Sequence, residues 1–112
     1  MKTVYIKNVC LASTFKNTNS YRLGTLFESI ESFARKTGNP HVNNFSKEGI
    51  DGAGKVHVIW QIQTPRGIGE IRDYWWNPKE QLSICAPNRI VFLWIKGWLK
   101  AFGFRAESGN GK

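Results

Sequence analysis

Four residues near the middle of the sequence have side chains suited to acid-base chemistry on a phosphate: His57, Glu70, Arg72 and Tyr74. A histidine and a carboxylate could exchange protons during RNA cleavage while an arginine holds the phosphate. In a hairpin with its loop at 65–68, however, His57 and Glu70 lie on the order of 20 Å apart along the strands. The sequence therefore favours a protein without catalytic activity and leaves a small RNA-cleaving enzyme as a less favoured alternative.

Metal and redox chemistry lack the residue spacing that they need. The two histidines, His41 and His57, have no further ligand at metal-binding spacing, so we expect neither a metal nor a cofactor. Cys10 and Cys85 match no paired-cysteine motif, and their apolar surroundings predict two buried free thiols.

The sequence also gives no sign of export or of a membrane partner. Lys7 interrupts the N-terminal apolar stretch before it reaches signal-peptide length. No apolar run reaches the roughly 18 residues of a membrane span. We therefore expect a cytoplasmic protein.

The net charge of +8 is concentrated in two segments. Residues 1–24 hold four basic residues and no acidic one, as do residues 89–105, whereas residues 25–88 carry seven of each kind. If the two basic segments are neighbours in space, they attract polyanions through a field that salt weakens. The charge distribution therefore predicts nucleic acid, either DNA or RNA, as the partner.

Candidate contacts to nucleic acid come from the basic segments and from the aromatic stretch "IRDYWWN" at 71–77. Lysines and arginines would contact phosphates, while Tyr74 and Trp76 would stack on bases or support sugars. The candidate residues are Lys7, Lys16, Arg22, Arg72, Tyr74, Trp76, Arg89, Lys96 and Lys100. The alternative is a protein-interaction module in which the charge serves only solubility.

Hydrophobic periodicity predicts the elements that position these residues. Strands are expected at 3–12, 55–64, 70–76 and 81–85, a short strand near 42–45, and a last helix from residue 89 onwards. A first helix, ended by Gly38, would carry one apolar stripe of Leu23, Leu26, Phe27, Ile30, Phe33 and Ala34. It would begin at Asn19 or Ser20, or at a capping box formed by Thr25 and Glu28.

The order β-α-β-β-β-α predicts an α+β fold, an antiparallel sheet with two helices packed on one face. We expect a single domain at 1–105 and a flexible tail at 106–112. Alternation in the central hairpin predicts a core face of Val58, Trp60, Ile62, Ile71 and Trp75. The opposite face would be polar and ligand-facing, with Tyr74 and Trp76 pointing outward. Asp73 falls on the core face and needs a hydrogen-bond donor there.

The last helix has an apolar arc of about 200°, wider than the stripe of somewhat more than 100° that packing on a sheet requires. The surplus predicts either packing against the first helix or a homodimer. In the homodimer, Phe92, Leu99 or Trp94 would meet a second copy.

Overall fold

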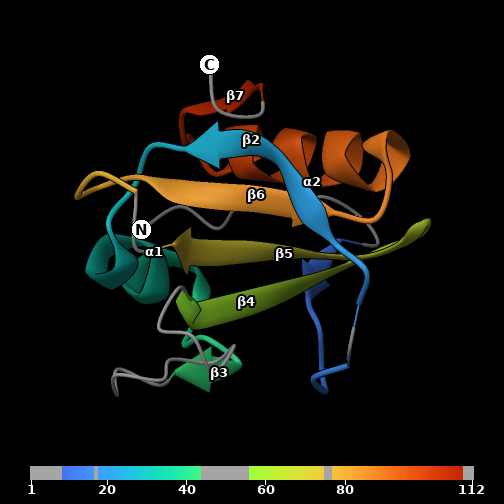
Figure 1. Cartoon of the computed structure of the whole chain (residues 1–112), viewed down its shortest axis with the longest axis horizontal. Coiled ribbons are helices and arrows are strands. Elements are labelled where there is room, and N and C mark those ends of the chain that lie inside the picture. Colours follow the sequence, from blue (N-terminus) through green and yellow to red (C-terminus); the bar gives the residue numbers. More distant parts are fainter. Residues whose placement is uncertain (1–8, 17, 44–55, 75–76, 110–112) are drawn as a thin grey trace.

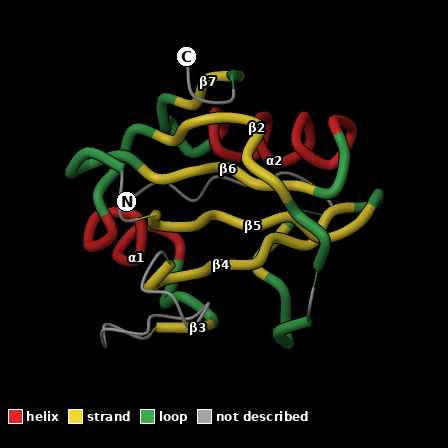
Figure 2. Tube along the Cα trace, in the orientation of Figure 1, coloured by secondary structure: helices red, strands yellow, loops and turns green. Residues whose placement is uncertain are grey.

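Seven strands and two helices form the described part of the computed structural model, which comprises residues 9–16, 18–43, 56–74 and 77–109 (Figures 1 and 2). They are β1 (Cys10–Leu11), β2 (Tyr21–Leu26), α1 (Ile30–Thr37), β3 (Val42–Asn43), β4 (Val56–Thr64), β5 (Gly67–Tyr74), β6 (Leu82–Ala86), α2 (Arg89–Ala101) and β7 (Ala106–Ser108). The strands form one antiparallel sheet in the order β1-β4-β5-β6-β2-β7, with β3 also paired to β4. The predicted α+β class with an antiparallel sheet is confirmed.

Both helices pack on the same face of the sheet, as predicted. Phe33 of α1 meets Trp60 of β4 edge to face, with ring centroids 4.9 Å apart. Phe92 and Ile95 of α2 lie directly over Gly24 and Gly69, where a Cβ atom would overlap their side chains. The two glycines therefore allow α2 to lie close against β2 and β5.

The first predicted helix begins too early. Residues 21–26 form strand β2, and α1 begins after Ser29, whose hydroxyl accepts a hydrogen bond from the Ser32 N–H at 3.1 Å. The predicted end at Gly38 is confirmed, with the glycine at φ 131°. The physical reason for the error is that β2 pairs on both edges, with β6 and β7. Strand partners so distant in sequence override a local helical period.

The predicted tail also begins too early. Ala106–Ser108 form strand β7 at the sheet edge, and Ala106 is buried against the core. The pairing of β7 with β2 was not foreseen, because β2 itself was expected to be helical.

The central hairpin has a tighter turn than predicted, with only Pro65 and Arg66 between paired Thr64 and Gly67. The register therefore differs by two residues from the expected one. A shift of two leaves every side chain on its expected face. Val58, Trp60, Ile62 and Ile71 are accordingly buried in the core. The predicted core residue Trp75 lies outside the described residues.

Asp73 satisfies its predicted need for a donor through the backbone. Its carboxylate accepts a hydrogen bond from the Val58 N–H, where the pairing of β4 and β5 is irregular between Val56 and Val58. The bonded carboxylate therefore tolerates a half-buried position beside the core.

Candidate nucleic-acid interface

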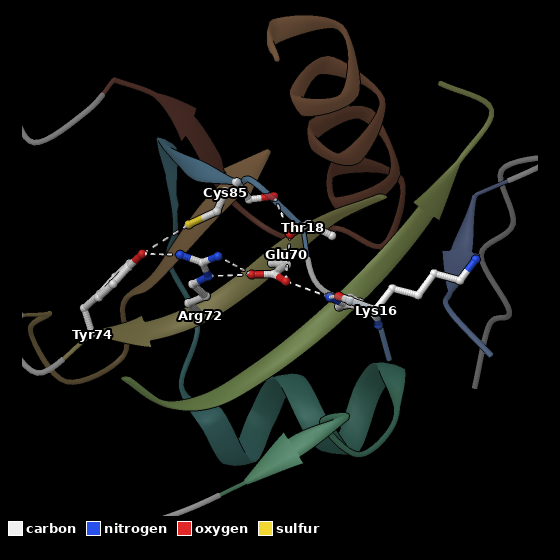
Figure 3. Close-up of polar contacts among 8 residues, drawn as sticks. Lys16, Thr18, Glu70, Arg72, Tyr74 and Cys85 are labelled. Atoms are coloured by element: carbon white, nitrogen blue, oxygen red, sulfur yellow. Dashed lines mark hydrogen bonds and ion pairs between the residues drawn. The ribbon is translucent and has the colours of Figure 1, made fainter. Parts of the chain in front are cut away.

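The sheet face opposite the helices carries a row of polar side chains centred on Glu70 (Figure 3). Gln61 Nε2 donates to Glu70 Oε2 at 2.7 Å. Arg72 Nε and Nη2 both lie 2.5 Å from Glu70 Oε1. The Glu70 side chain is only 3% exposed. The prediction that this face meets a ligand directly is therefore wrong at Gln61 and Glu70, which are buried.

Lys16 and Thr18 cover these two residues. The Lys16 N–H donates to Gln61 Oε1 at 2.9 Å, and Gln61 Nε2 donates to the Lys16 carbonyl at 2.5 Å. The Thr18 hydroxyl donates to Glu70 Oε2 at 3.0 Å. The Lys16 side chain points away from this network into solvent (Figure 3). The Lys16 backbone is thus fixed to the sheet, whereas its side chain is exposed to solvent.

Arg72 and Tyr74, both candidate ligand contacts, are engaged inside the protein. Arg72 Nη1 donates to the Tyr74 hydroxyl at 2.7 Å, and that hydroxyl lies 3.8 Å from Cys85 Sγ. Burial lowers the pKa of the Arg72 guanidinium, but Cys85, Glu70 and Tyr74 together raise it more, so that it stays charged. Burial also raises the pKa of Tyr74. The positive charge of Arg72 is thus balanced by its ion pair with Glu70, so the guanidinium is not available to a phosphate.

Cys85 has an acid-base property that can be tested. Burial raises the pKa of its thiol from 9.0 to about 11, although Arg72 partly opposes the shift. The folded chain then retains a proton that the unfolded chain loses, so we expect the free energy of unfolding to fall as pH rises from about 9 to about 11. Urea unfolding across this range measures the fall. Cys85→Ala should reduce it, whereas Cys10→Ala, which changes an exposed thiol, should not. An equal fall in both variants would contradict the assignment.

Both cysteines are free, as predicted, but Cys10 is exposed rather than buried.

His41 has a structural role. Its Nδ1 accepts from the Gln61 N–H at 3.0 Å, so the proton is on Nε2, which lies 2.6 Å from the Ala12 carbonyl. The ring therefore bridges β4 and the residue after β1 (Cys10–Leu11). Within residues 9–16, 18–43, 56–74 and 77–109 no group of three potential metal ligands is found. The side chain of His57 lies outside the described residues.

Arg22 lies on the polar face beside β6. Its guanidinium donates to Ser83 Oγ at 3.1 Å and to Thr25 Oγ1 at 2.6 Å, and it reaches the Gly109 carbonyl at 3.5 Å. Among the described residues no carboxylate pairs with it. Its positive charge is thus fixed in place but not neutralised.

Arg89, Lys96 and Lys100 form a row along α2, which we call the basic row. Their spacing of seven and four residues places them on one side of the helix. Lys96 Nζ donates to Ser108 Oγ at 3.0 Å. In the part of the chain that the structure describes, no carboxylate pairs with any of the three.

One residue from each basic segment, Arg22 and Lys96, lies at the end of strand β7. Arg22 reaches Gly109 from the polar face, and Lys96 reaches the preceding residue, Ser108, from α2. Figure 1 shows β7 at the edge of the sheet, next to β2 and α2. The structure does not bring Arg72 or Lys16 to this edge. Lys7 and Trp76, the other two candidates, lie outside the described residues.

Beside the basic row, the outer side of α2 carries an apolar strip formed by Ile90, Leu93, Trp94 and Gly97. The first three are 56%, 48% and 37% exposed, and the four residues line a hollow of about 380 Å³. Sequence reasoning predicted a surplus apolar flank on this helix but named only Trp94 of the four residues, because the opposite side of α2 is apolar too.

Two of the residues expected at a dimer interface are in the core. Phe92 and Leu99 are fully buried, whereas Trp94 is partly exposed. The surplus apolar arc therefore lies on the Ile90 side of the helix and not on the Phe92 side.

Comparison with family models, curated proteins and solved structures finds no match for this chain. No helix among the described residues is long and apolar enough to cross a membrane.

Proposed function

We propose that this protein binds nucleic acid without transforming it, and that the outer side of α2 is the main contact surface. The observation that carries the proposal is the basic row of Arg89, Lys96 and Lys100, unpaired among the described residues. At 1.5 Å per residue the row is about 16 Å long. Cations held along such a line suit the successive phosphates of a polynucleotide.

Lys100, in the last turn of α2, complements the helix dipole, but Arg89 in the first turn does not. In α1, an acidic residue in the first turn and basic residues in the last turn complement the helix dipole. By contrast, α2 begins with Arg89 and has no acidic residue in its first turn. This placement opposes the dipole, which supports a role for Arg89 in binding an anion.

The acidic side chains that the structure describes leave the field of the basic row largely unopposed. Glu70 is paired with Arg72 and Glu107 with Arg105, at 2.5 and 2.9 Å. Four other acids line a separate cavity of about 190 Å³ near the start of α1, formed without any residue of α2: Glu28, Glu31, Asp73 and Glu80. Arg22 adds a further unpaired charge at the β7 edge.

We propose the cytoplasm as the location, which suits an exposed free thiol at Cys10.

Salt dependence tests the proposal. The logarithm of the affinity for a generic oligonucleotide should fall linearly with the logarithm of the salt concentration. The slope should be roughly 0.7 to 0.9 per phosphate contacted. Lys96→Glu with Lys100→Glu should weaken binding by more than about tenfold and reduce the slope by about 1.4 to 1.8. Fluorescence anisotropy at several salt concentrations measures both quantities.

A charge-matched control separates the position of charge from its amount. Arg35→Glu with Lys79→Glu changes the net charge equally at exposed sites outside α2, and should cause a much smaller loss. Equal losses would show that net charge alone governs binding. Binding that does not depend on salt would contradict the proposal.

The apolar strip supports a second candidate function, a protein-interaction module. Its partner would be another protein or, in a homodimer, a second copy of this chain. Exposed apolar patches on a soluble domain commonly mark interfaces. The contact would use Ile90, Leu93 and Trp94 in place of the buried Phe92 and Leu99. Light scattering at micromolar concentration distinguishes a 12.8 kDa monomer from a dimer.

A further inference from the structure

We infer that the nucleic acid bound is single-stranded and that one of its unpaired bases stacks on Trp94 in the hollow of the apolar strip. The inference rests on the proposed nucleic-acid function and adds the class of strand. It depends on three features of α2: the shape of the hollow, the chemistry of its lining and the position of the basic row.

The hollow is open enough for a flat ring. A Cβ atom at Gly97 would meet nothing within 4 Å, so the helix backbone forms the floor between the neighbouring side chains. Trp94 borders this space and is 37% exposed. Trp98, on the next turn, is by contrast buried at 5% exposure, with Phe102 5.0 Å away. Trp94 is therefore the indole of α2 that a ligand can reach.

The lining of the hollow favours an unpaired base over a duplex. Ile90, Leu93 and Gly97 have no polar side-chain atoms, and Trp94 contributes only its indole N–H. A duplex presents polar base edges in its grooves, and burying these against aliphatic side chains without hydrogen bonds is unfavourable. An unpaired base exposes an aromatic face that stacks on tryptophan whatever its identity.

The charge pattern fits a single strand because it is one-sided. At 100° per residue, Lys96, Arg89 and Lys100 fall within about 20° of one line along the helix. The apolar strip lies on one side of that line, at about 40° to 140° from Arg89. A single strand carries its phosphates along one side and its bases along the other, which matches this pattern. A second copy of the same helix would instead bring an identical set of positive charges.

The experiment compares single-stranded and duplex oligonucleotides of equal length with the full chain and three variants. We expect the single strand to bind at least about tenfold more tightly. Trp94→Ala should weaken single-strand binding about 5- to 150-fold, the usual effect of losing one stacked base, while Trp94→Phe should retain most of the affinity. Tyr21→Ala is the matched control, because Tyr21 is an exposed ring (54%) on β2 rather than α2.

The salt slope separates this inference from the proposed function. Trp94→Ala removes no charge, so its slope should equal that of the unchanged protein. Tighter duplex binding, or equal effects of Trp94→Ala and Tyr21→Ala, would overturn the inference while salt-dependent binding through Lys96 and Lys100 still stood. No binding to either oligonucleotide would overturn both. A dimer that forms without nucleic acid and is lost in Trp94→Ala would assign the strip to a second copy and overturn the inference.

Discussion

Replacing Glu70 with alanine is expected to lower the free energy of unfolding by about 3 to 5 kcal/mol, because it leaves a largely buried arginine without its counter-charge. The Glu70 carboxylate is 3% exposed and the Arg72 side chain 17% exposed, so water cannot replace the lost partner easily. The same change removes the acceptor for Gln61 and Thr18. The attachment of Thr18 to the sheet is weakened as a further consequence.

Chemical denaturation of paired variants measures this effect. Glu107→Ala is the control, because the Glu107–Arg105 ion pair is solvent-exposed, at 54% and 68%, and such pairs contribute less than about 1 kcal/mol. Replacing Glu70 and Arg72 together by leucine and methionine should cost less than Glu70→Ala, since no charge is then left unpaired. A loss in Glu70→Ala no larger than that in Glu107→Ala would show that the pair is not effectively buried.

Replacing Trp60 with alanine is also expected to cost about 3 to 5 kcal/mol, the range for removing a large buried ring. Trp60 is fully buried on β4, and its ring packs edge to face against Phe33 of α1. Its indole N–H donates to the Gly38 carbonyl at 2.9 Å, where α1 ends. This one side chain therefore fixes α1 to the sheet by packing and by a hydrogen bond.

Two further substitutions separate these contributions. Trp60→Phe keeps an aromatic ring but leaves the Gly38 carbonyl without its donor, so part of the loss should remain, including about 1 kcal/mol for the hydrogen bond. Trp94→Ala, which removes a partly exposed indole, should change the stability far less. Thermal and urea unfolding should give the same ranking. A cost for Trp94→Ala that equals the cost for Trp60→Ala would contradict the burial that the structure shows.

Features that depend only on residues close together in the chain were predicted correctly from the sequence. Alternation identified Val58, Trp60 and Ile62 as core side chains, and it remained correct although the hairpin register differed by two residues. The spacing of Arg89, Lys96 and Lys100 placed them on one side of a helix, because helical geometry alone relates them. Gly38 marked the end of α1 for an equally local reason, its positive φ.

Features that depend on partners distant in sequence became visible only in the folded structure. The strand at 21–26 exists because β6 and β7 pair with it on both edges. Glu70 is buried because Thr18, 52 residues earlier in the chain, covers it. A local period contains no information about either partner, so a helix and an exposed glutamate were the reasonable predictions.

The orientation of α2 shows the same division within the candidate site. Both sides of this helix are apolar, so the sequence alone could not say which one faces the sheet. The glycines decide it: Gly24 and Gly69 leave room for Phe92 and Ile95 to lie against the sheet, where a Cβ atom would overlap them. That packing turns Ile90, Leu93 and Trp94 outward beside the basic row. The residues of the proposed interface were thus present in the sequence, but close packing against two glycines exposed them together.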